Sequence, residues 1–136
     1  MVVVVAAGNN GTAKSDTVGY PGNSPNVISV ANLDDSSKPL KTHPSSSQGP
    51  AVDLSAPGTA IRSSVPNDTF ANYTGTSMAS PYVAGVAALL AVKNPHWTAA
   101  QIRERLYKTS DDLGARGRDD VYGHGAVDPY EALFGL

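Results

Sequence analysis

The 136 residues are the length of one domain and leave no room for a second large one. Ten Lys and Arg residues against 12 Asp and Glu give a formal net charge of −2, so the chain offers no basic field for nucleic acid or for an anionic membrane. It contains no cysteine, which excludes disulfides, cysteine-ligated zinc, iron–sulfur clusters and thiol catalysis.

The chain opens on an apolar run, Val2 to Ala7, that ends at Gly8. Consecutive valines favour a strand, and apolar side chains on both of its faces are typical of a parallel sheet covered on both sides. The run is far shorter than the about 20 residues of a membrane span. After a loop rich in Gly and Pro, residues 27–31 are predicted as a second strand.

Residues 32–50 are polar and are predicted to form turns. Two more short strands are expected at residues 52–54 and 61–65, around the turn Ala56-Pro57-Gly58. The segment from Phe70 to Thr76 follows without a predicted element.

From about Ser77 to Lys93 the pattern is helical with almost no polar face, so we expect this helix to be buried. Pro81 is compatible with two different first residues for this helix. With Ser80 as the N-cap, Pro81 would be the first helical residue, where its missing N–H costs nothing. If the helix begins at Thr76, Pro81 lies inside it and removes one hydrogen bond. We favour the second.

The next helix has clear start signals. Thr98 and Gln101 have the spacing of a capping box, and Trp97 and Ile102 that of a hydrophobic staple. Near the end of the chain, the segment from Gly123 to Pro129 is predicted as a last strand and turn.

Several candidates for chemistry are weak. The segment from Gly8 to Ser15 approaches a phosphate-binding loop, but Ala13 stands where that loop needs glycine. His43, Asp53 and Ser77 occur in the order of one catalytic triad, although order alone carries little information. The chain shows no set of side chains that we assign to a metal.

The strongest functional signal is the string Gly75-Thr76-Ser77-Met78-Ala79-Ser80-Pro81. A hydroxyl in the first turn of a buried helix lies at the positive end of the helix dipole, where developing negative charge is favoured. Thr76 and Ser77 could also be ordinary helix caps. The complete string, however, resembles the nucleophile motif of the subtilisin-like serine peptidases, the subtilases.

Other segments resemble the same family, in the same order, from residue 2 to about residue 133. These segments are Ala6-Ala7-Gly8-Asn9 (the oxyanion segment), Val18-Gly19-Tyr20-Pro21 (a wall of the substrate pocket), Ala56-Pro57-Gly58 (a turn), Asn94-Pro95-His96-Trp97-Thr98 (the last long helix) and Tyr122-Gly123-His124-Gly125-Ala126-Val127-Asp128 (the closing segment). The resemblance implies an α/β fold with three layers, in which helices flank a mostly parallel sheet. Residues 1–136 would form the C-terminal portion of the catalytic domain.

The resemblance also implies roles for single residues. Ser77 would be the nucleophile, and the side chain of Asn9 would join the backbone N–H of Ser77 in the oxyanion hole. Residues that would contact the substrate are Ala6, Ala7, Gly8, Gly19, Tyr20, Pro21 and Thr76, and the Tyr20–Pro21 bond would be cis. The chemistry would need no cofactor, but a structural calcium ion could bind where some relatives hold a weak cation, at positions matched by Gly22, Ser24, Val27 and Asp53.

The chain departs from the family in one decisive respect. The family's triad runs Asp, His, Ser, and its Asp-Thr/Ser-Gly and His-Gly-Thr segments are both absent here and would precede Met1. His124-Gly125 belongs to the closing segment and receives no catalytic role. Without a general base a serine hydroxyl is a weak nucleophile, so we expect the chain alone to be inactive or nearly so.

Two functions therefore stay open. The chain is part of a serine endopeptidase that acts on peptides or proteins, with the missing Asp and His supplied by an N-terminal half on the same precursor or on a second chain. Alternatively, it is a non-catalytic remnant that binds peptides or a partner. An extracellular location is expected from the resemblance, because members of the family are mostly secreted.

Overall fold

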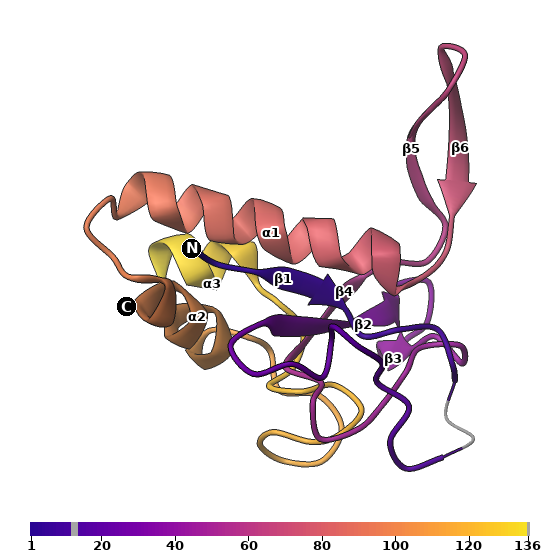
Figure 1. Ribbon diagram of the computed structural model, residues 1–136, viewed down its shortest axis with the longest axis horizontal. Helices are drawn as coiled ribbons and strands as arrows, with labels where there is room; N and C mark the ends of the chain where they lie inside the picture. Colours follow the sequence, from indigo (N-terminus) through magenta and orange to yellow (C-terminus); the bar gives the residue numbers. More distant parts are fainter. Residues whose placement is uncertain (12–13, 136) are drawn as a thin grey trace.

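A computed structural model describes residues 1–11 and 14–135, so Ala13 of the rejected phosphate-loop pattern lies outside the described residues. Its centre is a four-stranded sheet with a long helix across one face (Figure 1). The strands are β1 (Val4–Ala6), β2 (Ile28–Asp34), β3 (Lys41–Thr42) and β4 (Leu54–Pro57). β1 and β4 run parallel to β2 on its opposite edges, whereas β3 is antiparallel to the end of β2. The sheet is therefore mostly parallel, as predicted.

β2 lies at the centre of the core, and six of its seven residues are buried. Ile28 and Val30 belong to the main hydrophobic cluster, which includes buried residues of the long helix. Ala31 joins a smaller cluster with Ala7, Val18 and Val52. Since side chains alternate between the two faces of a strand, residues on both faces of β2 are covered, and most of them are apolar or small.

The long helix, α1 (Thr76–Lys93), begins at Thr76, so Pro81 lies inside it as favoured from the sequence. Its buried residues follow a helical stripe that rests on β1, β2 and β4. They are Thr76, Ala79, Val83, Val86, Ala87 and Leu90. The length and mean hydropathy of α1, 1.2, would also suffice for a membrane span by composition alone.

The expectation that α1 is buried all round is wrong. Leu89 is 54% exposed and Val92 is 81% exposed, because the sheet lies against one face of α1 only. α1 therefore has an outer face with exposed apolar side chains, so the apolar composition of the helix did not predict which of its residues are buried.

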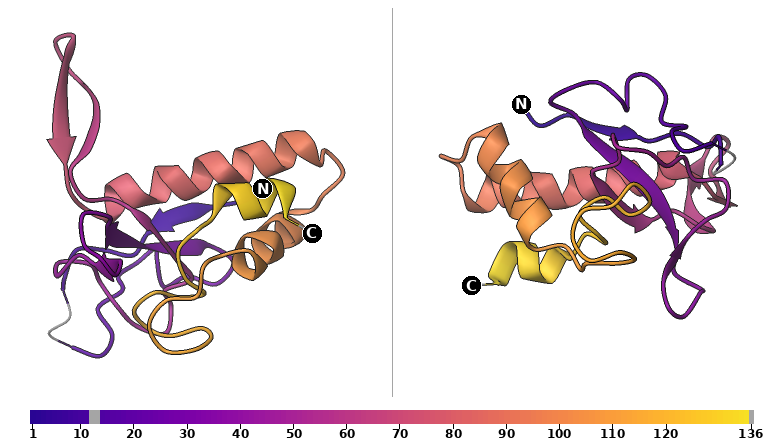
Figure 2. Two further views of the ribbon diagram at one scale, coloured as in Figure 1. Left: turned by 180° about the vertical axis from the view of Figure 1, so that it is seen from behind. Right: turned by 90° about the horizontal axis from the view of Figure 1, so that it is seen from below.

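Two shorter helices pack at the C-terminal end of α1 (Figure 2). α2 (Ala99–Lys108) has the predicted capping box: Gln101 N–H donates to the Thr98 hydroxyl, and Thr98 N–H donates to the Gln101 side chain. α3 (Pro129–Phe134) begins where a strand and turn were predicted. Asp128 caps it by accepting from the N–H of Glu131, a signal that the sequence analysis missed.

The remaining strands differ in part from the predictions. β5 (Ile61–Val65) has the predicted bounds, but its antiparallel partner β6 (Thr69–Tyr73) was not predicted. Together they form a hairpin that projects from the body of the molecule (Figure 1). β3 was also missed, and β4 starts at Leu54 instead of residue 52. Strands this short carry little propensity signal of their own, because packing and pairing with other strands determine them.

Candidate active site

The end of β1 meets the start of α1, although the two segments are 67 residues apart in the sequence. The backbone N–H of Thr76 donates to Asn9 Oδ1 at 3.0 Å, and the Thr76 hydroxyl donates to the same oxygen at 3.1 Å. The Thr76 Oγ1 also accepts from the backbone N–H of Gly8 at 3.2 Å. These bonds place Asn9 beside the residue that precedes Ser77.

The same bonds fix the orientation of the Asn9 amide. Both contacts with Thr76 use Oδ1, so the two hydrogens of Asn9 Nδ2 are left to donate elsewhere. No acceptor for Nδ2 occurs among the described residues, and the Asn9 side chain is exposed beside Gly75. Asn9 therefore presents a free hydrogen-bond donor at the surface.

A second free donor lies at the start of α1. A helix leaves its first four N–H groups without partners inside the helix. Here the N–H of Gly75 donates to Gly58, that of Thr76 to Asn9, and that of Met78 to Gly75. Of these four groups, only the N–H of Ser77 has no acceptor among the described residues, and the Ser77 side chain is exposed next to it.

The two segments that the sequence assigned to the substrate pocket lie side by side. The N–H of Gly19 donates to the carbonyl of Ala7 at 3.4 Å, and the Tyr20–Pro21 bond is cis. Tyr20 is largely exposed, whereas Ala7 is buried. The residues from Ala6 to Gly8 thus border the residues from Gly19 to Pro21, close to Asn9.

A polar cavity of about 350 Å³ opens nearby, lined by Asn10, Lys14, Asp16 and Thr17. The Asn10 side chain donates to the carbonyl of Thr17 at 3.2 Å across this region. The sequence analysis considered Lys14 only as part of the rejected phosphate-loop pattern and did not single out Asp16, because an isolated charge in a polar loop carries no signal of its own.

The histidines of the described residues form no hydrogen bond with Ser77. His43 Nδ1 lies 2.9 Å from the Ser45 hydroxyl and accepts from the backbone N–H of Ser45. The His124 ring stacks on Tyr107 with the ring centres 4.4 Å apart. The order His43, Asp53, Ser77 therefore does not correspond to an assembled triad.

The carboxylate of Asp53 serves the fold. Its Oδ2 accepts from the backbone N–H of Ser29 at 2.9 Å, and burial raises the pKa of Asp53 above its ordinary value. The described residues contain no cluster of three or more His, Cys, Asp or Glu side chains. Of the cation ligands implied by resemblance, only Asp53 is charged; the Ser24 hydroxyl and main-chain oxygens would have to supply the rest. Such an oxygen-only set fits a weakly held calcium ion.

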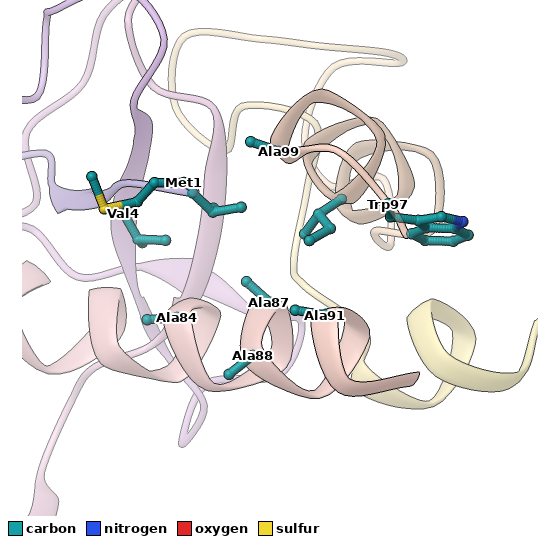
Figure 3. A pocket seen from close by; sticks show the side chains of 10 residues that line it. Met1, Val4, Ala84, Ala87, Ala88, Ala91, Trp97 and Ala99 are labelled. Carbon is teal, nitrogen blue, oxygen red and sulfur yellow. The ribbon is translucent and has the colours of Figure 1, made fainter. Parts of the chain in front are cut away.

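An apolar cavity of about 380 Å³ lies elsewhere, between β1, α1 and the start of α2 (Figure 3). We call it the β1–α1 groove. It has no lining residue in common with the site around Asn9 and Ser77, and no titratable side chain lines it. Its lining residues are Met1, Val2, Val4, Ala84, Ala87, Ala88, Ala91, Trp97, Ala99 and Ile102.

Comparisons with known proteins agree with this arrangement. Residues 1–125 match the Subtilase family. The chain is 44% identical over 128 residues to subtilisin E of Bacillus subtilis (strain 168), covering 93% of this chain and 32% of that protein. It is 43% identical over 128 residues to a subtilisin of Bacillus pumilus, covering 93% of this chain and 44% of that protein. The chain thus spans less than half the length of these relatives.

Solved structures give the same result. Fervidolysin from Fervidobacterium pennivorans, described as a keratinolytic enzyme related to subtilisin, superposes with a TM-score of 0.87 at 36% identity, over 99% of this chain and 22% of that one. Sphericase superposes with a TM-score of 0.86 at 30% identity, over 93% of this chain and 47% of that one. The fold is the α/β fold of subtilisin-like proteins, and the chain belongs to the subtilase family.

Proposed function

We propose that this chain is the C-terminal portion of a serine endopeptidase domain, which cleaves peptide bonds through an acyl-enzyme on Ser77. The observation that carries the proposal is the pair of unused donors, Asn9 Nδ2 and the Ser77 N–H, beside an exposed hydroxyl at the start of α1. The subtilase membership of the chain supports the same chemistry.

In this mechanism Ser77 Oγ attacks the carbonyl carbon of the scissile peptide bond. The carbonyl oxygen becomes negative, and Asn9 Nδ2 and the Ser77 N–H donate to it at the positive end of the α1 dipole. In subtilisin itself, loss of the asparagine donor costs about 2.7–4 kcal/mol of transition-state stabilisation. Asn9 would have the same role here because Thr76 already holds its oxygen, and so aims its nitrogen outward.

The proton of Ser77 needs a base that the described residues do not provide. We propose that an N-terminal portion of the domain supplies the His and the Asp, on the same precursor or on a second chain. The half-buried strand β1 pairs only with β2, which leaves one edge free among the described residues. The β1–α1 groove, which Val2 and Val4 help to line, lies next to β1. Unpaired apolar edges readily accept another strand.

The alternative is a remnant that binds peptides without cleaving them. It is favoured by the absence of a hydrogen bond between Ser77 and any histidine in the part of the chain that the structure describes. The two proposals differ in what happens once the missing half is present.

The test joins the chain to the segment of subtilisin E that precedes the region aligned with it. A biotinylated peptide phosphonate should label Ser77 in the assembled complex, and the chain alone should be labelled only weakly. Ser77→Ala should abolish labelling, and Asn9→Ala should slow it by about 10²–10³-fold. A complex that elutes as one species in size-exclusion chromatography but is not labelled would favour the peptide-binding remnant.

A further inference from the structure

Ser47, in the loop after β3, holds the two residues on either side of Asn9. Its backbone N–H donates to the carbonyl of Gly8 at 2.8 Å, and its Oγ accepts from the backbone N–H of Asn10 at 3.1 Å. Ser47 is 1% exposed, so its hydroxyl is buried where it accepts from the Asn10 N–H. We propose that Ser47 is a positioning residue, which fixes Asn9 as an oxyanion donor; this role rests on the proposed function.

The bonds of Ser47 complement those of Thr76. Thr76 accepts from the N–H of Gly8 and donates to the side-chain oxygen of Asn9. Ser47 donates its N–H to the carbonyl of Gly8 and accepts from the N–H of Asn10. The peptide groups around Asn9 are thus held from the helix on one side and from the loop on the other. Preorganised donors are effective because they need not move during the reaction.

The fit between Ser47 and the segment is close. Gly8 has a φ of +114°, and a Cβ at this position would lie 2.9 Å from Ser47 Oγ. No other residue than glycine fits here without displacing the hydroxyl or straining the backbone. The Ser47 hydroxyl therefore supports the turn that carries Asn9 past β1.

A neighbouring residue provides a matched control. Ser46 is also buried, and its Oγ also accepts one backbone N–H, that of Asn32 in β2, at 3.0 Å. The Ser46 hydroxyl also donates to the carbonyl of Ser47 at 3.4 Å, and it forms no hydrogen bond with residues 8–10. Ser46→Ala and Ser47→Ala therefore remove the same hydroxyl from the same loop, and only the second removes a bond to the segment with Asn9.

The first experiment measures backbone hydrogen exchange by NMR on the chain as it is. Ser47→Ala should accelerate exchange of the Asn10 N–H by about 5-fold, relative to Ser46→Ala, because the loss of one hydrogen bond is worth about 1 kcal/mol. Ser46→Ala should instead accelerate exchange of the Asn32 N–H. Equal exchange of the Asn10 N–H in the two variants would overturn the proposal.

The second experiment measures peptide hydrolysis by the complex assembled with the subtilisin E segment. Ser47→Ala should lower kcat by about 10- to 100-fold with KM little changed, because small displacements of a catalytic group have effects of this size. Ser46→Ala should leave kcat near that of the parent complex.

A double-mutant cycle then separates positioning from general damage. In an Asn9→Ala background, Ser47→Ala should lower kcat by less than about 2-fold further, because the donor that it positions is already gone. The full additional loss in that background would overturn the proposal. If no variant of the complex is active, the proposed function fails, and the exchange experiment still decides whether Ser47 holds the segment around Asn9.

Discussion

Replacing Thr76 by valine tests the junction between β1 and α1 without any enzyme activity. Valine has nearly the shape of threonine and a similar helix propensity, so the change removes a hydroxyl and leaves no cavity. The Gly8 N–H loses its acceptor, and Asn9 Oδ1 loses one of two donors. Thr76 is 0% exposed, so water cannot readily replace the hydroxyl.

The magnitude follows from these two bonds. Each contributes about 0.5–1.5 kcal/mol net, so Thr76→Val should lower the free energy of unfolding by about 1–3 kcal/mol. Trp97 is the single tryptophan and packs against the core, so its fluorescence can report urea unfolding. With a slope of about 2 kcal/mol per molar urea, the midpoint should fall by roughly 0.5–1.5 M.

The control is the adjacent Ser77→Ala, which alters an exposed hydroxyl and should change the free energy of unfolding by less than about 0.5 kcal/mol. A midpoint for Thr76→Val equal to that of the control would refute the reasoning, since the hydroxyl would then be unimportant for joining the two segments. A changed slope would mean that unfolding is no longer comparable between the variants.

Three further predictions concern other parts of the fold. Thr98→Ala should lower the free energy of unfolding by about 1 kcal/mol in the same urea assay, and Thr98→Asp should restore most of it, because either oxygen can cap α2. Gly125→Ala should abolish soluble expression or strongly lower the free energy of unfolding, because the new Cβ would overlap a main-chain carbonyl. Gly117 has open space around it, so Gly117→Ala should lower the free energy of unfolding by only about 1 kcal/mol, through strain at positive φ. Burial and the charge of Arg118 lower the pKa of His124 below 6.5. The unfolded chain therefore binds a proton at His124 more readily than the folded chain does. The stability that is present above about pH 6.5 is lost as the pH falls. In His124→Gln the urea midpoint should fall less between about pH 7.5 and about pH 5 than it does in the parent chain. An equal fall of the midpoint in both proteins would contradict the prediction.

Local sequence was sufficient where neighbouring residues determine the structure. The capping box at Thr98, the start of α1 with Pro81 inside it and the bounds of β5 all depend on residues within a few positions of one another. The string around Ser77 likewise identified the family before any contact was known. The start of α3 at Asp128 was equally local, so its omission was an error of interpretation rather than a limit of the sequence.

The rest needed the tertiary structure, because it depends on which distant segments meet. Apolar composition suggested that α1 is buried on every side, yet Leu89 and Val92 are exposed since the sheet covers a single face. The start of β4 depends on its pairing with β2, in which Leu54 lies opposite Val30. The sequence could align Asn9 and Ser77 with a motif, but the orientation of the Asn9 amide follows from its contacts with Thr76, 67 residues away. Hydrogen bonds across such a separation leave no periodic signal in the chain, so only the folded structure reveals which donors remain free.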